Sequence, residues 1–208
     1  MSDALIEFDR QLDHLVSLGY PALAGTSEAS FRDGFAPLRD VVAARPDADV
    51  ERGEDHIPFL LVPNGLPREE TIARTALGKQ QGFTVLEAGE LTTFRPIEGV
   101  EVPDGPGYLL FDIDTGTAFL NVTPQDALVQ ITADGRSPLT IDEGIALVTA
   151  RPDMLRKNKC FSLLASRCGD KRVPALWISD RKPKLGWCWN GNPHTWLGSA
   201  HAGQRVGV

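Results

Sequence analysis

The apolar residues of this chain change their spacing once along its length, and that change constrains the fold more than any other feature. They recur at helical spacing in residues 3–18 and again in residues 26–44, so that each segment has one apolar face. Gly19-Tyr20-Pro21 ends the first segment, and Thr26 or Ser27 is a suitable N-cap for the second. Two packed helices are therefore expected before any strand.

A polar segment separates these helices from the rest of the chain. The run from Arg45 to His56 is rich in Asp and Glu and lacks an apolar period, which is typical of an exposed connection. From Ile57 onward, the apolar residues form short runs bounded by Pro and Gly, as strands do. The sequence thus predicts an N-terminal helical hairpin over 1–44, an acidic linker over 45–56 and a sheet-containing domain over 57–208.

The strands expected in the sheet-containing domain cluster in the sequence, with few helices among them. They span residues 57–62, 82–87, 108–114, 118–122, 127–132, 160–166, 173–179 and 184–189. A helix is expected over residues 141–150, with Thr140 as its cap and acids in its first turn, and a short one over 68–76. Because helices do not alternate with strands, the fold class is α+β, with a mixed or antiparallel sheet and one or two further helices.

Charge is divided unevenly between the two ends of the chain. Residues 151–208 carry eleven Lys or Arg and three acids, a net charge of +8, whereas residues 1–150 carry ten and twenty-five, a net charge of −15. The basic end also holds all four tryptophans and all three cysteines. A basic, Trp-rich segment on an acidic body either packs against that body or binds an anionic ligand. A long nucleic acid is disfavoured as a partner, because the acidic body would repel it beyond a small patch.

The sequence indicates a cytoplasmic protein without disulfides, metal or cofactor. At 208 residues and 42% hydrophobic, the chain is long enough to bury a core without cross-links. Cys160, Cys168 and Cys188 are odd in number and irregularly spaced, which favours reduced thiols. No signal-peptide pattern opens the chain, and no apolar stretch approaches the roughly 18 residues that span a bilayer. We therefore expect no association with a membrane.

The strongest candidate for a ligand site is the segment from Trp187 to Trp196. On a strand, Trp187 and Trp189 share one face, and the following Asn-Gly-Asn-Pro turn presents Asn192, His194 and Trp196. Aromatic faces can stack on a planar ligand, and the amide and imidazole can hydrogen-bond it. The alternative is that these tryptophans fill a core or an interface, where each buries a large apolar area.

A second candidate is the cationic block from Arg167 to Arg172. Arg167 and Arg172 could supply positive charge to an anionic ligand of the tryptophan segment. The same charges around Cys168 favour its thiolate, so Cys168 as nucleophile and His194 as base form a candidate catalytic pair. The alternative is a hairpin turn whose charges are solvated and partly paired with Asp170.

Two further patterns point to no site. Cys160, Cys168, Cys188 and His194 could supply four zinc ligands, but their spacing does not match the paired cysteines of common structural sites. The segment from Asp112 to Thr117 superficially resembles a phosphotransfer motif, but Gly116 stands where that motif has a threonine. It is better interpreted as a hairpin with outward-facing aspartates.

Several blocks of the sequence resemble a known family. They are Leu18-Gly-Tyr-Pro-Ala-Leu-Ala-Gly25, Pro138-Leu-Thr-Ile-Asp-Glu-Gly144, Ser166-Arg-Cys-Gly-Asp170, Arg172-Val-Pro-Ala-Leu-Trp-Ile-Ser179 and Lys184-Leu-Gly-Trp-Cys-Trp-Asn-Gly-Asn-Pro-His-Thr-Trp-Leu-Gly-Ser199. Together they resemble an actinobacterial family catalogued as a domain of unknown function. The resemblance covers nearly the whole chain and implies a bacterial cytosolic protein, but it brings no activity, cofactor or residue role.

Three functions from different classes remain open at the level of sequence. The first is a binding module for a small anionic or aromatic ligand in the region from Trp187 to Trp196. The second is an enzyme that uses Cys168 and His194. The third is a structural or interaction protein whose Trp-rich end forms a homo-oligomer or partner interface, since aromatic residues and arginine anchor many interfaces.

Overall fold

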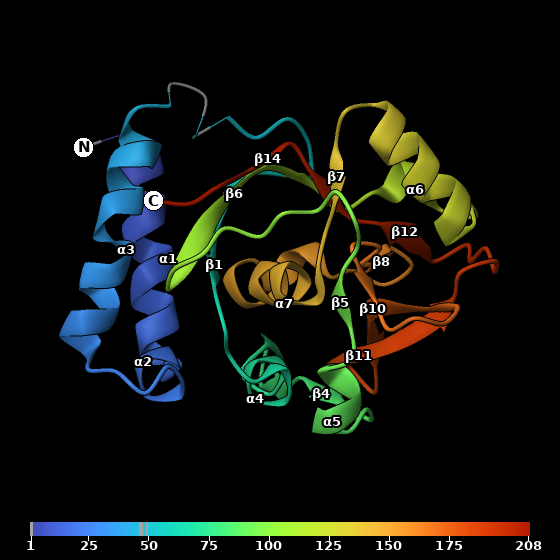
Figure 1. Cartoon of the computed structure of the whole chain (residues 1–208), viewed down its shortest axis with the longest axis horizontal. Coiled ribbons are helices and arrows are strands. Elements are labelled where there is room, and N and C mark those ends of the chain that lie inside the picture. The colour runs from blue at the N-terminus through green and yellow to red at the C-terminus, as the bar shows by residue number, and fades with distance from the viewer. Residues whose placement is uncertain (1, 46–47, 49) are drawn as a thin grey trace.

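The computed structural model describes residues 2–45, 48 and 50–208, whose helices and sheets are arranged in layers (Figure 1). Helices α1 (Asp3–Ser17) and α3 (Glu28–Ala43), joined through the short helix α2 (Tyr20–Leu23), form the predicted hairpin. A first sheet follows this hairpin, then helix α7 (Ile141–Ala150), then a second sheet. The α+β class is confirmed.

The first sheet is antiparallel in every described strand pair. Its order is β1 (His56–Pro63), β6 (Gly107–Asp114), β13 (His201–Ala202) and β7 (Ser137–Pro138), and β14 (Gln204–Val206) also pairs with β6. Strand β6 therefore has β1 on one side and the C-terminal segment on the other. The last residues of the chain complete a sheet that began at residue 56.

The second sheet is mixed and is built largely from the basic end of the chain. Its order is β12 (Leu197–Ser199), β8 (Cys160–Ser162), β10 (Arg172–Ser179), β11 (Lys182–Trp189) and β4 (Phe83–Thr84). Strands β8–β10 and β10–β11 pair antiparallel, whereas β12–β8 and β11–β4 pair parallel. The single mixed or antiparallel sheet expected from the sequence is thus divided into two.

Short elements connect the layers. They are helices α4 (Arg68–Ile72), α5 (Ala88–Leu91) and α6 (Pro124–Ala133), the 3-10 helices η1 (Thr117–Phe119) and η2 (Pro152–Met154), and the two-stranded ribbons β2 (Ala76–Leu77) with β3 (Gln80–Gln81) and β5 (Arg95–Pro96) with β9 (Ser166–Arg167). None of the helices in the described residues is long and apolar enough to cross a membrane.

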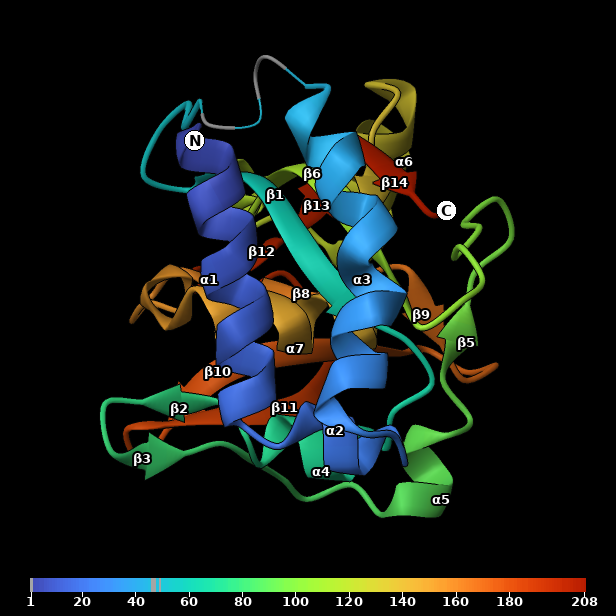
Figure 2. The ribbon, with the colours of Figure 1, turned by 90° about the vertical axis from the view of Figure 1, so that its left-hand side faces the viewer.

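The helical hairpin packs directly on the outer face of the first sheet, as Figure 2 shows for α1 and α3 over β1. Alternate residues of β1 and β6 point toward it, because successive strand side chains face opposite ways. Phe59 and Phe111 on that face join Phe8, Phe35 and Leu38 of the helices in one buried cluster. Hairpin and sheet share a core, and each fully buried Phe or Leu contributes about 1.5–3 kcal/mol.

A second core surrounds α7 between the two sheets. Leu60 and Leu110 from the first sheet, Leu147 from the helix, and Leu176 and Leu185 from the second sheet belong to one buried cluster. The predicted helix over 141–150 is confirmed to the residue. Its N-terminus is fixed by a capping box, in which the Thr140 hydroxyl accepts from the Glu143 N–H and the Glu143 carboxylate accepts from the Thr140 N–H.

The strands predicted over 118–122 and 127–132 are wrong. The first segment begins in η1 and has no strand, and the second lies inside helix α6. The Thr123 hydroxyl accepts a hydrogen bond from the Asp126 N–H, and Pro124 occupies the first helical position, which starts a helix despite the β-branched residues that follow. The predicted strand over 82–87 is reduced to β4, and that over 160–166 is divided into β8 and β9.

The hairpin predicted after β6 is also wrong, and Gly116 is the reason. Its φ of 75° favours glycine, and a Cβ there would overlap the backbone of Ser199. The chain therefore turns at Gly116 to lie against β12 instead of returning beside β6. The turn at Gly116 therefore depends on its contact with Ser199, which is distant in the sequence.

Candidate functional site

Much of the charge division is neutralised inside the molecule. Five cations of the basic end pair with acids of residues 1–150, and these ion pairs are Arg151 with Glu51, Arg156 with Glu54 and Asp55, Lys159 with Glu54 and Asp55, Arg172 with Glu90, and Arg205 with Glu143. The basic segment thus packs against its own acidic body. A binding site for an anion would need cations of the basic end that are not paired in this way.

The four tryptophans lie on both faces of the second sheet. In the register of β10 and β11, Trp177 is opposite Lys184, whereas Trp187 is opposite Pro174 and Trp189 opposite Arg172. Because strand side chains alternate between faces, Trp187 and Trp189 share one face, as the sequence predicted, and Trp177 lies on the other. The sheet therefore separates two aromatic groups.

On the first of these faces, Trp187 and Trp189 meet edge to face with ring centroids 4.8 Å apart. The Arg172 guanidinium lies 5.7 Å from the Trp187 ring, but its charge is already paired with Asp170 at 2.8 Å and with Glu90. Trp189 is 47% exposed. This face offers aromatic surface without spare positive charge from Arg172.

The opposite face carries a continuous row of rings and ammonium groups. The Trp196 ring lies 6.3 Å from that of Trp177, and the His194 ring lies 5.2 Å from Trp196. The Lys184 ammonium lies 5.3 Å from the Trp177 ring and 5.6 Å from the Phe83 ring, which the parallel register places beside it. We call this row the Trp177 face; its members are Phe83, Trp177, Lys182, Lys184, His194 and Trp196.

Gly186 shapes the Trp177 face. It lies between Lys184 and Cys188 on the same side of β11, and a Cβ there would overlap the Trp177 indole. The missing side chain lets the indole lie across the neighbouring strand. Both lysines of this face lack an ion pair within the described part of the chain, and the Lys182 ammonium lies 6.0 Å from the Phe83 ring.

The residues predicted from sequence are thus divided between two places. His194 and Trp196 lie together on the Trp177 face, and Trp187, Trp189 and Arg172 lie on the other side of the sheet. Asn192 is exposed in the turn, where its N–H donates to the Trp189 carbonyl. Arg167 is half-buried and donates to the Ser166 carbonyl and the Asn190 side chain. Sequence reasoning had not included Trp177, Lys184 or Phe83.

Cys168 has a different environment from the one expected. Its thiol donates to the Asp170 carboxylate at 3.2 Å, and burial together with this hydrogen bond raises the pKa of Cys168. The neighbouring carboxylate therefore favours the thiol over the thiolate. The other proposed member of the pair, His194, has its ring against Trp196. Across the described residues, no group of three or more His, Cys, Asp or Glu side chains is arranged to hold a metal ion.

A charged network around Asp112 was not anticipated. Asp112 has a left-handed backbone, with φ of 57°, and its carboxylate accepts from His56 at 2.8 Å, Arg136 at 2.6 Å and Arg52 at 3.0 Å. Arg136 also donates to Nδ1 of His201 at 2.7 Å, and burial with this neighbouring cation lowers the pKa of His201. The outward-facing Asp112 expected from the sequence is instead the centre of an ion network.

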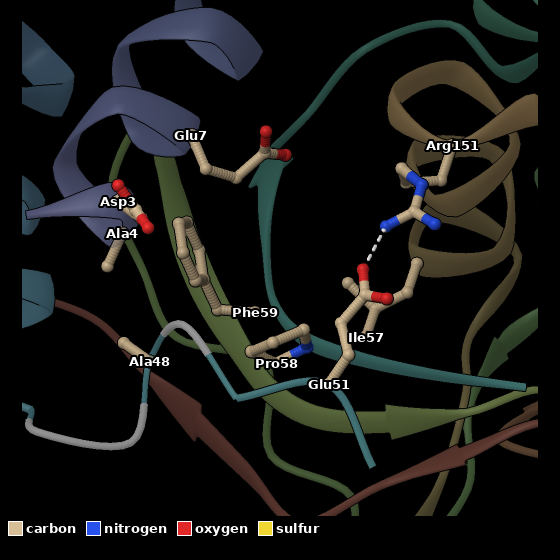
Figure 3. Close-up of a pocket in the computed structure, with 9 residues that line it drawn as sticks. All are labelled: Asp3, Ala4, Glu7, Ala48, Glu51, Ile57, Pro58, Phe59 and Arg151. Atoms are coloured by element: carbon tan, nitrogen blue, oxygen red, sulfur yellow. Dashed lines mark hydrogen bonds and ion pairs between the residues drawn. The ribbon is translucent and has the colours of Figure 1, made fainter. Parts of the chain in front are cut away.

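A cavity of about 230 Å³ lies between α1 and β1 (Figure 3). Asp3, Glu7 and Glu51 contribute carboxylates to its wall, and Phe59 contributes an aromatic ring. Glu7 already accepts from Arg10 and Gln11, and Glu51 from Arg151 at 2.8 Å. Most of the charge around this cavity is thus satisfied by the protein itself.

Comparison with known proteins defines the class of the chain but no activity. A family model described as a family of unknown function, DUF5701, matches residues 14–208. The chain belongs to this family, which confirms the expected membership in a domain family of unknown function. No curated protein and no solved structure matches the chain.

Proposed function

We propose that the protein is a binding module for a small anionic ligand that carries a planar ring, and that the Trp177 face is its site. The observation that carries this proposal is Lys184, whose ammonium lies near two aromatic rings and has no carboxylate partner within the described residues. An unpaired cation beside half-buried aromatic rings can attract an anion that carries a planar group. Stacking on such a ring contributes about 1–3 kcal/mol per base in nucleic-acid systems.

The charge distribution favours a small ligand over a polymer. Residues 1–150 have a net charge of −15, which repels those parts of an extended polyanion that come within about 10 Å of the acidic surface at moderate salt. Lys182 and Lys184 offer positive charge over a short stretch of one sheet face. A single nucleotide suits this arrangement better than a long nucleic acid.

Fluorescence titration with adenosine 5′-monophosphate tests the proposal, because Trp177 and Trp196 would report stacking directly. Trp177→Leu and Lys184→Gln should each weaken binding about tenfold or more. Trp189→Phe, on the opposite face, is the matched control and should leave the affinity unchanged. Unaltered binding by Lys184→Gln, or equal affinity for uncharged adenosine, would contradict the proposal.

A second candidate function is a homo-oligomeric or partner interface at Trp187 and Trp189. The observation in its favour is that Trp189 is 47% exposed. The ring of Trp187 meets it edge to face on the same side of the sheet. Exposed tryptophan beside arginine is a common anchor of protein interfaces. Sedimentation of the wild type and Trp189→Ala over a range of concentrations tests this candidate, and a monomer in both cases excludes a homo-oligomer.

The enzyme alternative has less support. It rested on a thiolate at Cys168, and the hydrogen bond from that thiol to Asp170 works against the thiolate. The cytoplasm remains the proposed compartment. Cys160, Cys168 and Cys188 are all free, which suits reducing surroundings.

A further inference from the structure

The two lysines of the Trp177 face lie two residues apart on one side of β11. Successive side chains of a strand point to opposite faces, so Lys182 and Lys184 lie on the same face, about 6.5 Å apart along the strand. Both ammonium groups lie near the ring of Phe83, at 6.0 Å for Lys182 and 5.6 Å for Lys184. The Trp177 face therefore carries two neighbouring positive charges.

The distances to the rings give the order of the groups along this face. The Trp196 ring lies 6.3 Å from the Trp177 ring, and the Lys184 ammonium lies 5.3 Å from the same indole. The Lys182 ammonium approaches the Phe83 ring and no other ring of the described residues. The row thus begins with two indoles, continues with the Lys184 ammonium and the Phe83 ring, and ends with the Lys182 ammonium.

No carboxylate of the described chain neutralises either ammonium group. Lys182 and Lys184 form no ion pair among the residues that the structure describes, and this includes Asp180 in the turn before β11. On the other face, by contrast, Arg172 is paired with Asp170 at 2.8 Å. Both lysines are half-buried. A cation that is partly withdrawn from water and has no carboxylate beside it gains from an anionic ligand.

We infer that the ligand of the Trp177 face is a diphosphate attached to a planar ring, as in a nucleoside diphosphate. This inference rests on the function proposed for that face. With the planar ring against Trp177, the phosphate nearest that ring would meet the Lys184 ammonium. The second phosphate, one bridging oxygen further along the row, would meet Lys182. Phosphate oxygens accept charge-assisted hydrogen bonds from ammonium groups. A nucleoside monophosphate would use only the first of the two lysines.

Calorimetric titration with adenosine 5′-monophosphate and adenosine 5′-diphosphate tests this inference. Both ligands are titrated at equal ionic strength and without divalent cations, so that the lysines alone meet the phosphates. The diphosphate should bind the wild type about tenfold more tightly, because it gains a hydrogen bond between charged groups. Inorganic pyrophosphate has both phosphates but no ring, and should bind about tenfold more weakly than the nucleoside diphosphate or worse.

Two lysine variants distinguish the two phosphate positions. Lys182→Gln should remove most of the preference for the diphosphate, because the second phosphate loses its cation. Lys184→Gln should weaken both nucleotides by a similar factor and keep the preference. Lys171→Gln is the matched control and should bind both nucleotides as the wild type does. Lys171 is exposed and lies at the other end of the strand pair, where its carbonyl accepts from the Asn190 N–H.

The possible failures of this inference and of the proposed function are distinguishable. Equal affinity of the wild type for the two nucleotides would overturn the inference and leave the proposed function standing. Binding of neither nucleotide would overturn both. A Lys182→Gln variant that is folded by circular dichroism and keeps the full preference for the diphosphate would show that Lys182 does not meet the second phosphate, which also overturns the inference.

Discussion

Arg205 donates to both carboxylate oxygens of Glu143, at 2.6 and 2.8 Å, and both side chains are buried. The Tyr108 hydroxyl donates to the same carboxylate at 2.8 Å, and Thr140 N–H at 2.7 Å. The C-terminal strand β14, the central strand β6 and the start of α7 are therefore joined at one charged centre. Burial and the neighbouring Glu143 raise the pKa of Tyr108, which keeps its hydroxyl protonated as a donor.

Replacing one member of this buried pair should be costly. Arg205→Met leaves the Glu143 carboxylate buried without its cation, and we expect a loss of about 3–5 kcal/mol in the free energy of unfolding. Urea denaturation followed by circular dichroism measures it. Arg32→Met, which removes an exposed arginine paired with Asp13 and Glu28, should cost about 1 kcal/mol or less. Equal losses in the two variants would show that burial of the Arg205 pair is not decisive.

The Asp112 network should make stability depend on pH in acid. Burial opposes the charge on Asp112, but hydrogen bonds from Arg136 and His56 outweigh it and lower the pKa of this carboxyl. Its contribution to stability is thus present above the unfolded value, about 3.9, and is lost as pH falls through the lower folded value. Asp112→Asn should be less stable than wild type at pH 7, with the gap closing toward about pH 3.

The choice of asparagine isolates the charge in this experiment. Asn tolerates the left-handed backbone that Asp112 adopts, so the substitution adds little strain. Chemical denaturation at a series of pH values gives the difference in unfolding free energy. A gap that stays constant from neutral to acid pH would mean that the ionisation of Asp112 does not stabilise the fold.

Gly186→Ala should disturb the Trp177 face. The added methyl group overlaps the Trp177 indole, and because the ring is wedged across the strand we expect a loss of about 1–3 kcal/mol in stability. Tryptophan emission should change, and binding of adenosine 5′-monophosphate should weaken. Gly191→Ala is the matched control, since a Cβ there meets no atom within 4 Å. Normal emission and binding in Gly186→Ala would remove Trp177 from the proposed site.

Cys168 should react slowly with alkylating reagents near neutral pH. Burial and the hydrogen bond to Asp170 raise the pKa of its thiol, so the thiolate fraction is below that of an ordinary cysteine, whose pKa is about 8.5. The rate of reaction with iodoacetamide against pH, followed by mass spectrometry of the Cys168 peptide, measures this. Asp170→Asn should accelerate the reaction. Rapid alkylation of wild type at pH 7 would revive the catalytic hypothesis.

Local signals were enough to predict some elements and not others. The helix over 141–150 has its cap, its acidic first turn and its apolar face in one short stretch, and β1, β6 and β10 each combine an apolar run with a flanking turn. In residues 118–133, β-branched composition favoured strands, while Thr123 and Pro124 signalled a helix start. The segment forms a helix because the Thr123 hydroxyl accepts the Asp126 N–H and so caps its N-terminus. The turn at Gly116 depends on Ser199 and has no local signal.

Only part of the candidate site could be predicted from the sequence. The period of two placed Trp187 and Trp189 on one face, which the register confirms. Nothing local relates Trp177 to Trp196, because their contact requires β12 to lie beside β8 and β8 beside β10. The same is true of His56 in β1, Asp112 in β6 and Arg136 in the connection between α6 and β7, which meet only in the folded chain.

The position of β13 and β14 beside β6 determines when the first sheet can close during synthesis. On the ribosome, β1 and β6 are made early, yet β6 keeps an unpaired edge until residues 201–206 have left the exit tunnel. Such an edge can accept a strand from another nascent chain. The first sheet is therefore incomplete until the basic end of the chain has been synthesised. A chaperone that shields the free edge of β6 in that interval would raise the yield of folded protein.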